Sequence, residues 1–112
     1  MKMSAEVLKI IEESQNQGKL EQVIDLVREL LTEYGIVPTE LQWMILINHL
    51  NEMLKRSQGE EKLSKVDQNL FREISKEAIT ISEKIVRNIG NLTEDEVYVL
   101  SIHFETAKII NT

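Results

Sequence analysis

Two histidines carry most of the reactive chemistry that this sequence offers. His103 lies within an apolar stretch near the end of the chain, and His49 lies on the flank of an earlier apolar stretch. An imidazole has an unperturbed pKa of about 6.5, so its neutral ring is a usable nucleophile near pH 7. A lone histidine on an apolar face is more often a hydrogen-bonded core residue. The second histidine, on a second apolar segment, favours a functional role for both.

Two charged residues accompany the histidines at fixed spacing. Arg56 follows His49 by seven residues, and Glu96 precedes His103 by seven. Seven residues are close to two helical turns, so each charged residue falls on nearly the same stripe of its helix as the histidine. The rise between them is about 10 Å, which makes direct contact within one helix unfavourable. Taken alone, Arg56 is more typical of a solvated helix edge.

Other kinds of site lack their characteristic residues. The chain has no cysteine, no glycine-rich phosphate loop and no HExxH motif. A zinc site built on two histidines so far apart in sequence would need carboxylates for most of its ligands. No serine or threonine lies in a recognisable setting for a catalytic triad. We therefore expect no enzymatic activity, no cofactor and no metal site.

The composition is that of one helical domain. The 112 residues suit a single domain spanning 1–112. One proline and four glycines provide little turn chemistry for hairpins, and a content of 42% hydrophobic but 4% aromatic residues implies an aliphatic core. The expected fold class is all-α, a compact bundle of about five helices.

The net charge and the apolar pattern indicate which classes of partner and which cellular compartment to expect. The net charge of −6 disfavours direct binding to nucleic acid. The N-terminal residues lack the apolar core of a signal peptide. The longest apolar run, from Trp43 to Ile47, is too short to cross a bilayer. The absence of cysteine fits a reducing compartment. We expect a cytoplasmic protein without membrane contact.

Apolar periodicity predicts five helices. Their expected ranges are Ser4 to about Asn16, Lys19 to Tyr34, Thr39 to a polar loop at 57–65, Ser64 or Asp67 to Ile89, and Leu92 to Ile110. Gly18 and Gly35 are expected to end the first two helices. The expected buried face of the third helix comprises Trp43, Leu46, Ile47, Leu50, Met53 and Leu54. That of the fourth comprises Leu70, Phe71, Ile74, Ala78, Ile81, Ile85 and Ile89.

Two helix starts carry capping-box spacing, in which a threonine is followed three residues later by glutamine or glutamate. These are Thr39 with Gln42 and Thr93 with Glu96. In the last helix one narrow polar strip is expected, formed by Ser101, Glu105 and Lys108. The rest of that helix is mostly apolar. We expect this wide apolar face to contact a second protomer as well as the rest of the bundle.

The surroundings of the histidines resemble the two motifs of the PTS regulation domain family. The segment Leu46-Ile47-Asn48-His49-Leu50, continuing to Arg56, is similar to the first motif. The segment Leu92-Thr93-Glu94-Asp95-Glu96, continuing to Ile102-His103-Phe104, is similar to the second. The interval between the histidines and the chain length also suit the family, so the resemblance covers nearly the whole chain. Neither motif is specific alone, and the two together carry the resemblance.

The resemblance implies a regulatory module. Members of the family are five-helix bundles, usually tandem pairs in bacterial sugar-operon antiterminators and activators. They are phosphorylated on histidine by the phosphotransferase system, through its phosphocarrier protein or a sugar-specific B component, and phosphorylation changes how they dimerise. By resemblance, His49 and His103 are the phosphorylation sites, and Arg56 and Glu96 are supporting residues.

The resemblance also implies partners. We expect a homodimer, a phosphotransferase-system protein as the phosphoryl donor, and an unidentified downstream protein, because the 112 residues hold one regulatory domain and no RNA-binding domain. The alternative is a non-phosphorylated structural domain for protein interaction or dimerisation, in which both histidines serve packing. Full burial of both rings in every oligomeric form would favour this alternative, since a phosphoacceptor must be reachable by its donor.

Overall fold

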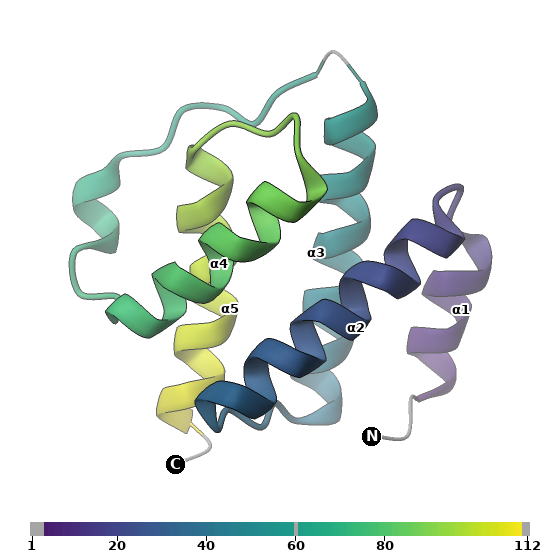
Figure 1. Ribbon diagram of the computed structural model, residues 1–112, viewed down its shortest axis with the longest axis horizontal. Helices are drawn as coiled ribbons and strands as arrows, with labels where there is room; N and C mark the ends of the chain where they lie inside the picture. The colour runs from purple at the N-terminus through teal and green to yellow at the C-terminus, as the bar shows by residue number, and fades with distance from the viewer. Residues whose placement is uncertain (1–3, 60, 111–112) are drawn as a thin grey trace.

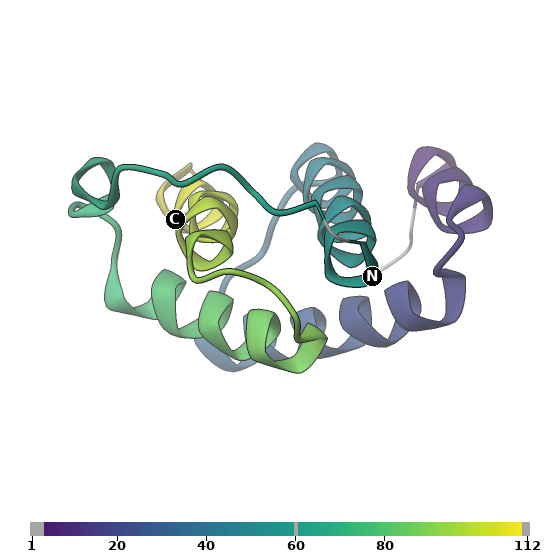
Figure 2. The same ribbon diagram turned by 90° about the horizontal axis from the view of Figure 1, so that it is seen from above.

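The helices of this chain form two layers. The computed structural model describes residues 4–59 and 61–110, with the backbone only for 109 and 110. Its elements are α1 (Ala5–Glu13), α2 (Gln17–Tyr34), α3 (Glu40–Gln58), the short 3-10 helix η1 (Gln68–Phe71), α4 (Lys76–Ile89) and α5 (Asp95–Ile110). Helices α1, α3 and α5 lie side by side in one layer, and α2 and α4 lie in the other (Figures 1 and 2). The described residues hold no strand, which confirms the all-α bundle.

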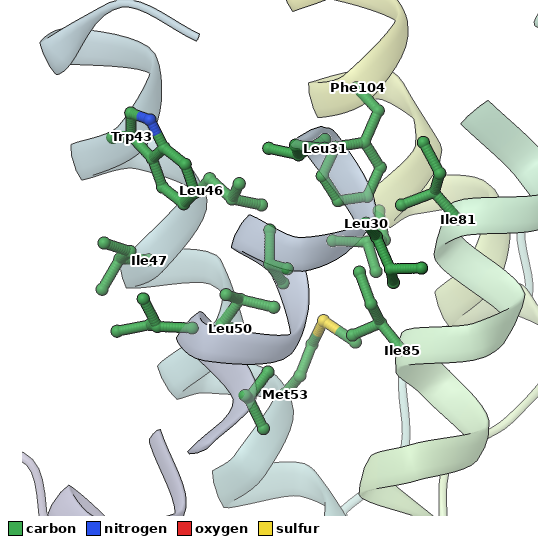
Figure 3. Close-up of a cluster of buried hydrophobic side chains, with 14 of the residues drawn as sticks. Leu30, Leu31, Trp43, Leu46, Ile47, Leu50, Met53, Ile81, Ile85 and Phe104 are labelled. Atoms are coloured by element: carbon green, nitrogen blue, oxygen red, sulfur yellow. The ribbon is translucent and has the colours of Figure 1, made fainter. Parts of the chain in front are cut away.

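The core lies between the two layers and is aliphatic, as the composition predicts. All six residues expected on the buried face of α3 are buried. Phe104 of α5, Leu31 of α2 and Ile81 of α4 point into the same cluster (Figure 3). Each of these three side chains is at most 2% exposed. Burial of this kind contributes about 1.5–3 kcal/mol for each large apolar side chain. Helices α3 and α5 are thereby held side by side.

The ends of α2 and α3 follow their capping signals. Gly35 ends α2 in the left-handed region at φ 68°, where a side chain would be strained. The capping box of α3 is complete. The Thr39 hydroxyl accepts the Gln42 backbone N–H at 3.1 Å, and the Gln42 side chain accepts the Thr39 N–H at 2.9 Å. The start of the helix that carries His49 is therefore well defined.

The predicted junction between the first two helices was wrong. Helix α1 ends at Glu13, and Gly18 lies in the first turn of α2 rather than ending the preceding helix. The hydroxyl of Ser14 explains the early end. It accepts the backbone N–H of Asn16 at 3.0 Å and donates to the Asn51 side chain at 2.7 Å. This pair of bonds turns the chain at Ser14 and ties the turn to α3.

The predicted start of the fourth helix, at Ser64 or Asp67, was also wrong. Helix α4 begins at Lys76, because the Ser75 hydroxyl caps it by accepting the Ala78 N–H at 3.3 Å. The preceding connection runs beside α5 and carries η1 (Figures 1 and 2). Leu70, expected in the core, is 76% exposed. The expected stripe is therefore buried only from Ala78 onward, at Ala78, Ile81, Ile85 and Ile89.

The connection before α4 is fastened to α5. The rings of Phe71 and Tyr98 lie 5.7 Å apart between centroids. The Glu105 carboxylate accepts both the backbone N–H of Ser75, at 3.2 Å, and its hydroxyl, at 2.6 Å. Phe71 and Ile74, also expected in the core of a longer helix, are only half-buried. The apolar pattern in this segment thus reflects packing of an irregular connection.

Helix α5 begins at Asp95 rather than Leu92, and its expected capping box is absent. The Thr93 hydroxyl is buried without a hydrogen-bond partner among the described residues. The Glu96 side chain binds Arg56 of α3 instead of reaching back to residue 93. Tertiary pairing has displaced the local cap.

The expected polar strip of α5 holds only in part. Ser101 is fully buried and donates its hydroxyl proton to the Tyr98 carbonyl at 2.6 Å. Lys108 forms an ion pair with Glu77 of α4 at 3.4 Å. On the apolar part of the helix, Ile102 is 44% exposed. In the part of the chain that the structure describes, every helix is too short or too polar to span a bilayer.

Candidate functional site

The two histidines meet where α3 and α5 lie side by side. His49 comes from α3 and His103 from α5, and their ring centroids are 4.9 Å apart with the planes tilted by 39°. Both side chains are half-buried. Residues that the sequence places in separate helices are therefore neighbours at one position, which is accessible in part from outside the bundle.

The two charged residues form a second pair between the same helices. The Arg56 Nε atom lies 2.6 Å from one Glu96 carboxylate oxygen, and its Nη2 atom lies 2.8 Å from the other. This is the bidentate geometry that a guanidinium and a carboxylate favour. Glu96 is 1% exposed and Arg56 is 19% exposed, so the pair is largely removed from water.

The spacing along the sequence explains why these four residues form two pairs. Helices α3 and α5 run in opposite directions (Figure 1). Moving seven residues forward from His49 and seven back from His103 therefore leads to the same level of the bundle. Once the histidines face each other, Arg56 must lie near Glu96. The mirrored spacing of seven is visible in the sequence, but it leads to this pairing only because α3 and α5 are antiparallel.

Burial governs the protonation of the two rings. Burial, together with the smaller effects of the His103 and Arg56 charges, lowers the pKa of His49 to about 4. Burial also lowers the pKa of His103. The hydrogen bond to Glu96 raises the pKa of Arg56. Near pH 7 both imidazoles are therefore neutral beside a permanent cation, and each neutral ring keeps one nitrogen with a free lone pair.

One atom of the site is left without a partner. His49 Nε2 is buried and has no hydrogen-bond partner among the described residues. A buried polar atom in this condition costs about 1–3 kcal/mol. Such atoms are rare in native proteins, and a functional role is one common explanation.

The site has a nucleophile but no metal-binding set. Within residues 4–59 and 61–110, no cluster of three or more histidine, cysteine, aspartate or glutamate side chains could hold a metal ion. Glu96 is the carboxylate that shares a stripe with His103, and Arg56 already occupies both of its oxygens. The arrangement is suited to attack by a neutral imidazole on an electrophile, with a cation nearby.

Comparisons with known proteins agree with this geometry. The family model described as PRD domain matches residues 21–107, a range that contains all four site residues. A crystal structure of a PRD-containing transcription regulator from Lactobacillus casei ATCC 334 is similar to this chain with 38% identity and a TM-score of 0.93. The match covers 97% of each chain. No curated protein matches the chain. The chain belongs to the PRD family, the PTS regulation domains.

Proposed function

We propose that this chain is a single regulatory domain, spanning 1–112, that is phosphorylated on the His49–His103 pair by proteins of the phosphotransferase system. The donor is the phosphocarrier protein or a sugar-specific B component, and the domain acts in the cytoplasm as a regulator rather than an enzyme. The observation that supports this proposal is the meeting of two neutral, half-buried imidazoles beside Arg56. Family membership supports the regulatory role.

Phosphorylation would disturb the ion pair that joins α3 to α5. A phosphoryl group brings between one and two negative charges, about −1.5 to −2 for a phosphate ester at pH 7. Arg56 is close enough to lower the pKa of His49, so it also attracts a phosphoryl group on either ring. If Arg56 turned toward the phosphoryl oxygens, Glu96 would be left buried without its cation. That state is costly, so the α3–α5 contact must rearrange.

Exposed apolar residues on α3 and α5 support a protein–protein interface around the histidines. Leu41 and Ile45, eight and four residues before His49 on α3, are 60% and 47% exposed. Ile102, next to His103, is 44% exposed. In our proposal these residues contribute to a homodimer interface around the site. A dianion introduced at its centre must be solvated or paired, so phosphorylation changes dimerisation or the binding of a downstream protein.

Intact-mass measurement tests the phosphorylation directly. Purified general phosphotransferase components and phosphoenolpyruvate are mixed with the wild type, His49→Ala and His103→Ala, with and without a panel of B components. We expect an acid-labile gain of phosphoryl mass on the wild type that one or both variants lack. Failure of every donor to modify the folded wild type would reject the proposal and favour the non-phosphorylated interaction domain.

Sedimentation of the same samples tests the second half of the proposal. We expect a dimer at micromolar concentration whose dissociation constant changes on phosphorylation. Ile45→Glu should weaken the dimer, whereas Leu8→Glu, an equally exposed apolar position on α1, should not. A wild type that stays monomeric at high micromolar concentration would exclude the homodimer.

A further inference from the structure

The two histidines of the pair are not equivalent. His49 Nε2 is among the buried side-chain polar atoms that lack a hydrogen-bond partner in the described part of the chain. Neither ring nitrogen of His103 is in this condition. Phosphoryl transfer between proteins requires the attacking nitrogen to approach a phosphorus atom held by another molecule. The enclosed His49 Nε2 is therefore less suited to this approach than a nitrogen of the half-buried His103.

We propose that His103 is the nitrogen nucleophile that receives the phosphoryl group and that His49 is its positioning partner, with His49 Nε2–H donating a hydrogen bond to a phosphoryl oxygen on His103. This inference rests on the proposed function and assigns different roles to the two rings. The unsatisfied nitrogen is explained, because the acceptor it lacks arrives with the phosphoryl group. The ring centroids, 4.9 Å apart, place the two side chains close enough for this contact.

The transfer balances without any further reactant. The lone pair on a neutral His103 nitrogen attacks the phosphorus of a phosphohistidine on the donor protein. The new nitrogen–phosphorus bond forms as the donor's nitrogen–phosphorus bond breaks, and the electron pair of the broken bond returns to the donor imidazole. When the donor ring is protonated on its other nitrogen, it leaves as a neutral imidazole, and His103 keeps its own ring proton. No oxidant, reductant or net proton is required.

Burial of His49 suits the positioning role. A protonated His49 would carry N–H donors on both ring nitrogens, would place a positive charge in a largely buried site and would repel a protonated His103. Because its pKa is about 4, His49 stays neutral and presents one N–H and one lone pair. A hydrogen bond from a neutral donor to a charged acceptor in a site with little water is stronger than a neutral pair.

Side-chain amides separate the two roles. Glutamine places an N–H donor near the position of a histidine Nε2, and asparagine is too short to do so. The transfer equilibrium is measured by intact mass at fixed ratios of phosphorylated to free donor. The donor is the phosphocarrier or the B component that modifies the wild type.

We expect His103→Gln to abolish the phosphoryl gain. We expect His49→Gln to keep the wild-type equilibrium within about three-fold and His49→Asn to lower it about ten-fold, as for one lost bond to a charged group. Asn48→Ala, exposed on α3, is the matched control, and circular dichroism confirms folding.

Each outcome decides the inference. The inference is supported if His103→Gln loses phosphorylation, His49→Gln keeps the wild-type transfer equilibrium and His49→Asn lowers it. A phosphoryl group found on His49 in His103→Gln overturns the assignment of roles. Equal behaviour of His49→Gln and His49→Asn overturns the hydrogen bond. If the wild type itself accepts no phosphoryl group from any donor, the proposed function fails. This outcome differs from a phosphorylated wild type whose variants contradict the two assigned roles.

Discussion

Helix α5 has an apolar face and a polar face, and the contacts of the apolar face are easier to predict from the sequence. The face toward the other layer carries Phe104 and Leu100, which are buried among apolar side chains. The face toward α3 carries Glu96 and His103, which meet Arg56 and His49. The first face is stabilised by burial that any aliphatic set of similar volume could supply. The second depends on particular atoms in particular places.

The difference separates stability from function in this domain. Apolar packing between the layers positions α3 and α5, and the polar contact between them uses that positioning. Removing one partner of the buried ion pair is destabilising. The intact pair adds little net stability, because desolvation of the two charges offsets their attraction. Variants on the two faces should therefore fail in different ways.

The largest effect is expected on the core face. Phe104→Ala removes a fully buried ring and should lower the free energy of unfolding by about 4 kcal/mol. Ile102→Ala, on the same helix but 44% exposed, should cost less than about 1 kcal/mol. Urea denaturation of both variants measures the contrast. Similar losses in the two variants would contradict the assignment of faces.

The ion pair should show the next largest effect. Arg56→Met leaves Glu96 buried without a cation and should cost about 3 kcal/mol. The double variant Arg56→Met, Glu96→Leu removes both charges and should recover most of this loss. Denaturation of the single and double variants forms the test. A double variant no more stable than Arg56→Met would show that the pair is not coupled as described.

Acid should weaken the domain through the histidine pair. The pKa of His49 is about 4 in the folded state and near 6.5 when unfolded, so the unfolded chain binds more protons between these values. Stability is therefore lost as the pH falls from 6.5 to 4, by roughly 3 kcal/mol from His49. Thermal or urea unfolding against pH should show a shallower loss in His49→Gln, which shares every carboxylate with the wild type. Parallel pH profiles would be the contrary result.

The smallest changes in stability are expected at Thr39 and Thr93, the two threonines with capping-box spacing. Thr39→Val removes a capping hydroxyl and should cost about 1 kcal/mol. Thr93→Val removes a buried hydroxyl that has no partner, so it should be neutral or stabilise by up to about 1 kcal/mol. The melting temperatures of the two variants give the comparison. Equal destabilisation would mean that Thr93 does cap α5.

The two threonines also show where sequence reasoning succeeds and fails. The box at Thr39 forms at the exposed start of α3, where the Thr39 and Gln42 side chains reach each other's backbone N–H groups. At Thr93 the third-position glutamate is drawn to Arg56 from another helix. Local patterns predict local contacts, and they fail where a distant residue offers a stronger one.

The fold and the candidate site show the same contrast between local patterns and contacts from distant residues. Helical periodicity predicted the number of helices and the buried face of α3, because burial follows the 3.6-residue repeat. It misplaced the start of α4, because Phe71 and Ile74 contact the bundle from an irregular connection. The resemblance singled out the four candidate site residues, whereas the contacts between them depend on the antiparallel packing of α3 and α5.

NMR can test whether the two histidines form one phosphorylation site. Nitrogen-15 and phosphorus-31 NMR of the histidine-labelled protein, before and after phosphorylation, reports on both rings at once. We predict a phosphorus coupling on one ring of the pair, with a changed chemical shift for the other ring, since the two are 4.9 Å apart between centroids. A phosphorylated protein in which both rings keep their original spectra would contradict the account.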